Sequence, residues 1–261
     1  MVYRGKVMND VELLNQVGLG KIKMAKEDPF RFFVRSLMAG FYLGGAMILS
    51  YACGAILSKN YPEFGKIALA GTFGIGLVAI VFLGADLFTG NCLTTMIPVY
   101  DKKAKLKDLL PAWVICYIGN MVGMSIVGFL FIKSGSLNTL FPTYLKPLME
   151  TKLTFSVVPL FIKGTLCNFL VCFAGYAGVK VKDGMVKFMI IMGFVMAFVL
   201  PGFEHCIANS GFFAMCITQY GTTLSQMGTI CYHMLIASIG NILGGAVMAG
   251  LPVYLIFRES K

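Results

Sequence analysis

The sequence predicts an all-α polytopic membrane protein of six transmembrane helices, two of them broken, in an inverted 3+3 repeat. An apolar composition, polar insertions in two apolar runs and a motif that recurs in both halves predict this fold. Of the 261 residues, 57% are hydrophobic and 13% are charged, and the mean hydropathy is +0.79. That composition is typical of a multi-span membrane protein. The net charge of +10 does not indicate a nucleic-acid partner, because the cations gather on one predicted side of the membrane.

The first segment, residues 1–30, is expected to be cytoplasmic and to contain an amphipathic helix. Val11 and Leu14 oppose Lys21 at helical spacing, which is typical of a helix lying on a basic membrane face. A solvated tail is the alternative. Residues 31–261 then form the six-span membrane domain.

Six apolar runs each reach the ~20 residues that cross ~30 Å of hydrocarbon. They cover residues 32–57, 67–99, 109–132, 155–179, 188–217 and 229–257. As continuous helices, the second and fifth runs would be about 45–50 Å long, more than a modestly tilted span needs. Both contain a polar stretch, at 84–91 and 200–209. Irregular backbone at membrane depth survives only against protein or water, so we expect two broken helices that line a pathway.

The orientation follows from the lysines and arginines. With a cytoplasmic N-terminus, sixteen of them fall on the cytoplasmic side and five on the other, so the positive-inside rule places both termini in the cytoplasm. The motif IGNxxG occurs at 118–123 and at 239–244, which indicates repeats of about 31–132 and 155–257. Three spans per repeat is an odd number, so the repeats have opposite orientation. The small residues of the motif are expected to permit close helix packing.

The stretch at 200–209 holds the strongest candidate for chemistry. His205 directly follows a Pro-Gly helix break, and a neutral imidazole can polarise a small anion or exchange a proton with it. A hydrogen-bonded core histidine is the alternative, but an ionisable group within the membrane favours function. Glu204 and Asn209 are expected to order the loop by hydrogen bonding.

The upstream stretch contains Thr89 and Asn91, and there free backbone N–H groups and the Thr89 hydroxyl can face the same pathway. Asn91 is expected to help order the loop. Asp86 is expected to cap the restarting helix. Lys152, on the outer side before the fourth span, can raise the local anion concentration, unless it is an ordinary interfacial lysine. Lys163 lies eight residues into that span and is expected to snorkel or to pair with a carboxylate.

Four apolar residues near the breaks can form constrictions or simply pack: Phe73, Leu77, Phe88 and Phe198. The eight cysteines lie in or beside apolar stretches without a CxxC, so reduced, packed thiols are expected. A membrane enzyme would need a nucleophile with a base, paired haem ligands or a metal cluster. None of these patterns is evident, so we expect no enzyme, no cofactor and no metal site.

Several stretches together resemble the formate/nitrite transporter family of pentameric channels. The stretches 84–89 and 202–209 are similar to its two signature loops, and Lys163 to Cys172 is similar to its fourth-span motif. The stretch 71–75 and the IGN pair extend the resemblance over nearly the whole chain. It implies an aquaporin-like protomer in which residues 31–261 form the channel domain, a homopentamer, and one pore in each protomer.

The resemblance also implies roles for single residues. It makes His205 the central pore histidine, Thr89 its hydrogen-bonding neighbour, Lys152 the vestibule lysine and Asn168 a helper near that lysine. The four apolar residues match positions near two hydrophobic constrictions. The segment 88–90 resembles the nitrite and hydrosulfide branches more than the formate branch, and Pro201 departs from the small residue expected there.

These expectations combine into a channel of the cytoplasmic (inner) membrane for small monovalent anions of weak acids, namely nitrite, hydrosulfide and formate. Desolvation of a bare anion at an apolar constriction is steeply unfavourable, whereas for its neutral conjugate acid it costs only a few kcal/mol. Proton sharing with His205 is therefore expected to assist passage. A channel for neutral solutes such as water, glycerol or ammonia is the closer alternative, and a membrane-bound enzyme the more distant one.

Overall fold

The computed structural model describes residues 2–3, 6–7 and 9–258, and nearly all of this chain is helical. Two short strands, β1 (Val2–Tyr3) and β2 (Lys6–Val7), pair antiparallel before the first helix. The helices follow in the order α1 (Asp10–Glu27), α2 (Pro29–Ser58), α3 (Pro62–Phe73), α4 (Ile75–Leu83), α5 (Phe88–Thr94), α6 (Met96–Tyr100), α7 (Leu106–Lys133), α8 (Phe141–Leu153), α9 (Val157–Lys180), α10 (Gly184–Val199), α11 (Cys206–Tyr220), α12 (Leu224–Ile242), the π-helix η1 (Leu243–Gly250) and α13 (Leu251–Phe257).

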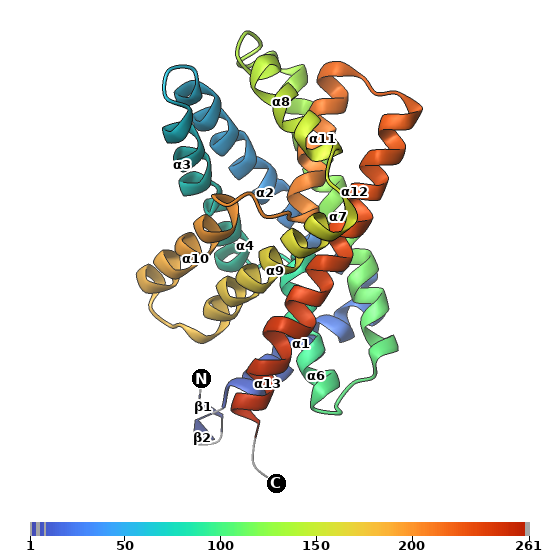
Figure 1. The fold of residues 1–261 in the computed structure, drawn as a ribbon. Coiled ribbons are helices and arrows are strands. Elements are labelled where there is room, and N and C mark those ends of the chain that lie inside the picture. The colour runs from blue at the N-terminus through green and yellow to red at the C-terminus, as the bar shows by residue number, and fades with distance from the viewer. Residues whose placement is uncertain (1, 4–5, 8, 259–261) are drawn as a thin grey trace.

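Five segments of the described chain are long and apolar enough to cross a membrane. They are Pro29–Ser58, Pro62–Leu83, Leu106–Lys133, Val157–Lys180 and Leu224–Phe257. The run 188–217, expected to be a broken helix, is divided between α10, of 16 residues, and α11, of 15 residues. Helices α1 and α13 lie at one end of the molecule and α8 at the other (Figure 1).

Helix α1 begins with a capping box in which Asn9 accepts from the backbone of Glu12 and Glu12 accepts from that of Asn9. Its apolar side chains Val11 and Leu14 are buried against α5, α6 and α13 in a cluster that includes Leu93. The expectation that this face lies on the membrane was wrong, because the ends of these helices beside α1 offer it an apolar surface within the protein. The described part of α1 is therefore a packed element of the fold.

The IGNxxG glycines lie where two pairs of helices cross. A Cβ on Gly123 of α7 would come within 2.4 Å of the Leu37 carbonyl oxygen of α2, and one on Gly240 of α12 within 2.5 Å of the Phe161 carbonyl oxygen of α9. Real Cβ atoms do not approach a carbonyl oxygen so closely, so only glycine lets these backbones meet. The expected role of the motif in close packing is thus present at both crossings.

Two interruptions bring irregular backbone into the middle of the molecule. Helix α4 ends at Gly84, whose φ of 76° belongs to the left-handed region, and α5 starts at Phe88. Helix α10 ends before Gly202, which also has a φ of 76°, and α11 starts at Cys206. Glycine adopts this conformation without the steric strain that a side chain would cause. Figure 1 shows the orange segment between α10 and α11 crossing the molecule at mid-height.

The connection between the two expected repeats, residues 133–154, contains α8. Pro142 and Pro147 conceal this helix in the sequence. Pro142 lies in its first turn, where no intrahelical N–H bond is lost, and Pro147 lies inside it. The helix carries Lys152 in its last turn, and so positions that side chain against the α10–α11 connection.

Candidate functional site

The two interrupted segments meet at His205 and Thr89. The Thr89 hydroxyl oxygen lies 3.0 Å from Nε2 of His205, across 116 positions of sequence. Both residues are at least 96% buried. Each stands at the start of a helix, Thr89 in the first turn of α5 and His205 at the N-cap of α11. The helix restarts therefore bring the two side chains expected to be neighbours into direct contact.

The backbone fixes the ring of His205. Its Nδ1 accepts the N–H of Ala208 at 3.2 Å, as an N-cap side chain does. In a neutral imidazole the other nitrogen then carries the proton, so Nε2–H donates to Thr89 Oγ1. The ring of Phe198 stacks on the imidazole with centroids 6.1 Å apart and an interplanar angle of 26°. This arrangement leaves the Thr89 hydroxyl hydrogen able to donate to a third partner.

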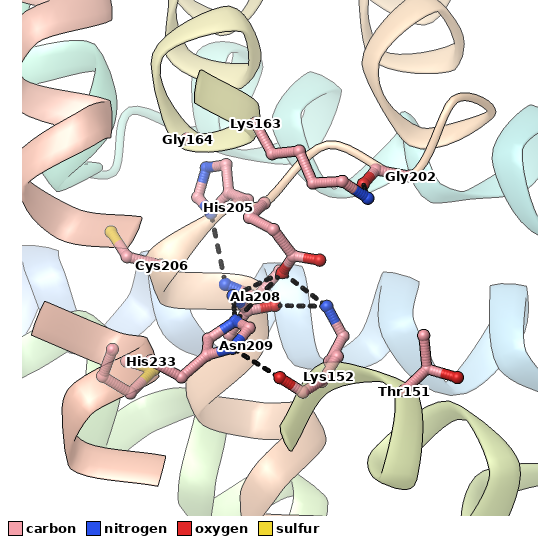
Figure 2. Close-up of polar contacts among 12 residues, drawn as sticks. Thr151, Lys152, Lys163, Gly164, Gly202, His205, Cys206, Ala208, Asn209 and His233 are labelled. Atoms are coloured by element: carbon pink, nitrogen blue, oxygen red, sulfur yellow. Dashed lines mark hydrogen bonds and ion pairs between the residues drawn. The ribbon is translucent and has the colours of Figure 1, made fainter. Parts of the chain in front are cut away.

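Glu204, next to the histidine, is the centre of a buried ionic network with Lys152, Asn209 and His233, the three residues that Figure 2 labels around it. Its Oε2 accepts from Lys152 Nζ at 2.5 Å and from Asn209 Nδ2 at 2.8 Å. Lys152 also donates to Asn209 Oδ1 at 3.1 Å. His233 donates from Nδ1 to the carbonyl oxygen of Lys152 at 3.0 Å and places Nε2 3.2 Å from Glu204 Oε2. The network ties α8, α11 and α12 to one carboxylate.

A second network surrounds Asp86 on the α4–α5 connection. Its two carboxylate oxygens pair with Arg35 Nε at 2.6 Å and with Lys21 Nζ at 3.1 Å. Lys21 also donates to Asn91 Oδ1 at 2.6 Å. The expected cap was wrong, because the N-cap of α5 is Leu87 and the helix has no side-chain cap bond. The carboxylate is therefore bound by two cations, Lys21 of α1 and Arg35 of α2.

Three cavities follow one another past the histidine. The cavity beside α8, called the outer cavity after the orientation expected from the sequence, has about 320 Å³ and is lined by Lys152, Glu204 and His205 among others. A narrow one of about 10 Å³, the space of a single water, also touches His205. It shares Leu77 with an inner cavity of about 160 Å³ that Lys21 lines. The shared residues place the three cavities in sequence.

Comparison with known proteins decides what this arrangement belongs to. The Formate/nitrite transporter family model matches residues 10–255. The nitrite transporter NirC of Salmonella typhimurium is 32% identical over 243 residues, which is 92% of this chain and 88% of that protein. The chain belongs to the formate/nitrite transporter family. The resemblance inferred from the signature loops is thereby confirmed.

Solved structures agree with the family assignment. An FNT family ion channel superposes with a TM-score of 0.86 at 27% identity, covering 95% of this chain and 99% of that one. A pentameric formate channel with formate bound superposes with a TM-score of 0.74 at 24% identity, over 88% and 98% of the two chains. The relatives are transporters and channels, and this chain is an integral membrane protein of the same fold.

The apolar residues expected at constrictions divide into two groups. Phe73, Leu77 and Phe198 line the narrow cavity together with His205. Phe88 does not line these cavities, because its ring packs edge-on against Tyr117 at 5.0 Å and Trp113 at 6.2 Å. The preceding Leu87 takes its place in the narrow and inner cavities. Helix α5 starts one residue later than Leu87, which turns the two side chains to opposite sides.

Asn168 also lies elsewhere than expected. Its Nδ2 donates to the carbonyl oxygens of Thr89 at 3.1 Å and of Asn241 at 2.7 Å. Asn168 therefore supports the signature stretch 84–89 and does not contact Lys152. Within the described residues, no group of three or more His, Cys, Asp or Glu side chains could hold a metal ion. The cysteines of this region are free thiols.

Sequence reasoning missed the asparagines of the IGN pair. Asn120 accepts from the backbone N–H of Phe88 at 2.8 Å and donates to the carbonyl oxygen of Asp86 at 2.8 Å. Asn241 does the same for Cys206 and Glu204, at 2.9 Å each. An amide repeated at the same motif position in two apolar spans was the available signal. Lys21, Arg35 and His233 left no such signal, because their partners lie far away in sequence.

Proposed function

We propose that this protein is a channel for small monovalent anions of weak acids, with nitrite as the leading candidate and formate and hydrosulfide in the same class. The contact between Thr89 and His205 carries the proposal. It leaves one hydrogen-bond donor free, the Thr89 hydroxyl, next to the imidazole that lines a narrow apolar cavity between two wider ones. The names of the relatives, a nitrite transporter and a formate channel, point to the same substrates.

The proposed channel has six spans in an inverted 3+3 repeat. Helices α3 to α6 make the second span and α10 with α11 the fifth, each broken at a signature loop. The matched bonds of Asn120 and Asn241 support the repeat, because each amide ties its own loop in the same way, to the residues at equivalent positions. The excess of lysine and arginine on one side supports a cytoplasmic position for both termini.

Passage depends on the balance between desolvation and hydrogen bonding. Entry into an apolar constriction is strongly unfavourable for a bare anion, while for its neutral acid it costs only a few kcal/mol. Phe73, Leu77 and Phe198 impose that barrier. The Thr89 hydroxyl, which accepts from His205 Nε2–H, offsets part of it by donating a hydrogen bond to the anion. Sharing a proton at His205 Nε2, or with water held beside it, lets the anion pass nearly uncharged. Lys152 lies in the wall of the outer cavity and holds the α10–α11 connection in place through its ion pair with Glu204.

The proposed assembly is a homopentamer in the inner membrane, with one pore in each protomer. The structural match to a channel described as pentameric supports it. The lipid bilayer covers the apolar side chains that remain exposed on one protomer, such as Phe82, Leu130 and Ile256.

The test of the proposal is anion flux through the purified protein in liposomes. His205→Phe keeps an aromatic ring against Phe198 and removes both ring nitrogens, so nitrite flux is expected to fall at least tenfold and to lose its pH dependence. Thr89→Ser, which keeps the hydroxyl, is the matched control and is expected to retain most of the flux. Unchanged flux and pH dependence in His205→Phe would remove the proton step. Liposome swelling by water or glycerol without any anion current would favour the neutral-solute channel instead.

A further inference from the structure

Three lysines but only one acidic side chain line the outer cavity: Lys66, Lys152, Lys163 and Glu204. Lys152 and Glu204 neutralise each other at 2.5 Å. The positive charge that an arriving anion meets must therefore come from the other two lysines. Lys66 is exposed at the surface, while Lys163 is half-buried on α9.

Lys163 is bound by uncharged partners. Its Nζ donates to the carbonyl oxygen of Gly202 at 3.3 Å and lies 4.4 Å from the centroid of the Phe155 ring. Within residues 9–258, no carboxylate lies within ion-pair distance of it. A carbonyl and a ring face hold an ammonium group without cancelling its charge, and two of its three N–H donors remain for a ligand. Figure 2 shows the side chain extended along the α10–α11 connection, towards Gly202.

The α4–α5 connection has a cation, Arg35, at the position that corresponds to Lys163, and there the cation binds the carboxylate of the loop. The backbone N–H of Asp86 donates to the carbonyl oxygen of Arg35 at 3.3 Å, and that of Glu204 donates to the carbonyl oxygen of Lys163, also at 3.3 Å. Arg35 and Lys163 therefore occupy matching places beside the two loops. Arg35 Nε binds the carboxylate of Asp86 at 2.6 Å, whereas Lys163 donates to the Gly202 carbonyl oxygen and Glu204 pairs with Lys152.

The reason for this difference lies in the partners of Glu204. Lys152, Asn209 and His233 already surround its Oε2, so the carboxylate has no need of a further cation. The side chain of Lys163 is left to face the cavity that Gly202 and His205 also line. Gly202 lies three residues before His205, so the ammonium group stands over the loop that carries the histidine.

We propose that Lys163 is the anion-capturing residue of the outer mouth, and that it hands a small monovalent anion from the cavity to His205. This inference rests on the proposed channel function and assigns the capture step within it to a residue other than Lys152. Lys163 raises the occupancy of the outer cavity by Coulomb attraction, while Lys152 holds Glu204 and the loop in place.

The experiment measures single-channel nitrite current against nitrite concentration in planar bilayers, using the full chain as assembled. Lys163→Gln removes the charge and is expected to raise the half-saturating concentration by about three- to tenfold at low ionic strength, with a smaller change in the saturating current. At about 1 M of an impermeant salt the difference is expected to shrink, because screening acts over ~3 Å. Lys163→Arg restores the charge and is expected to restore capture.

Lys146→Gln is the matched control, because Lys146 is an exposed lysine of α8 that does not line the cavity. It is expected to conduct as the parent does. An unshifted half-saturating concentration in Lys163→Gln, in a parent that conducts, would overturn this inference alone. An equal shift in Lys146→Gln would overturn it too, since the effect would then belong to overall charge. A parent that passes no nitrite would remove the proposed function and this inference with it.

Discussion

At the scale of single residues, the α10–α11 and α4–α5 connections each contain a buried carboxylate whose negative charge must be compensated by a cation. Glu204 is 3% exposed and Asp86 is 1% exposed. Taking such a group out of water costs several kcal/mol unless a cation and hydrogen bonds compensate for it. Lys152 does this for Glu204, and Arg35 with Lys21 does it for Asp86. The main contribution of Lys152 at the outer mouth is therefore structural.

Removing that cation is expected to destabilise the protein strongly. Lys152→Met leaves the charge of Glu204 buried and uncompensated, so the free energy of unfolding is expected to fall by about 3–5 kcal/mol. In the double variant Lys152→Met/Glu204→Gln no ionised carboxylate remains, and at least half of the loss is expected to return. Denaturant titration in detergent micelles gives the four values of the cycle. If the single and double variants were equally unstable, the ion pair would not be what Lys152 contributes.

At the scale of elements, the position of each helix is set by where backbones can touch. Gly240 on α12 lies against α9, while a Cβ added to Gly228 on the same helix would meet nothing within 4 Å. The two glycines thus lie on the same helix, but only Gly240 is in close contact with a neighbouring helix. Their substitution separates packing from helix propensity.

Gly240→Ala is expected to lower the free energy of unfolding by about 1–3 kcal/mol, because the added methyl group forces α9 and α12 apart. Gly228→Ala adds the same atom where there is open space and is expected to be neutral or stabilising by up to about 1 kcal/mol. Thermal unfolding of both variants in the same detergent measures the difference. Equal effects would show that the close approach of the two helices is not needed.

The sequence predicts some elements well and others poorly, for physical reasons. The polar stretches 84–91 and 200–209 coincide with the connections between α4 and α5 and between α10 and α11, because polar groups and glycine in an apolar run can be recognised locally. The partners of Asp86 could not be found this way. Lys21 is 65 positions away on a helix whose apolar face matches lipid as well as it matches protein, so only the packed fold decides between them.

At the scale of the whole molecule, the two ends differ in their number of positive charges and in whether a helix covers the cavity there. Helix α1 packs over the inner cavity and contributes Lys21 to its wall, while the outer cavity is open to Lys66 and Lys163. In the proposed six-span topology, sixteen lysines and arginines fall on the α1 side and five on the other. Positively charged segments are retained in the cytoplasm during insertion, so the α1 end is expected to face the cytoplasm.

Labelling in whole cells tests that orientation. Lys59 follows α2 at one end and Lys182 lies between α9 and α10 at the other, and both are exposed. With Cys53 and Cys231, the thiols that are not buried, replaced by serine, Lys59→Cys is expected to react with a membrane-impermeant thiol reagent in intact cells. Lys182→Cys is expected to react only after permeabilisation. The reverse pattern would place α1 and Lys21 outside the cytoplasm. The cavity lined by Lys66, Lys152 and Lys163 would then open to the cytoplasm. Anions would in that case reach His205 past Lys163 from within the cell.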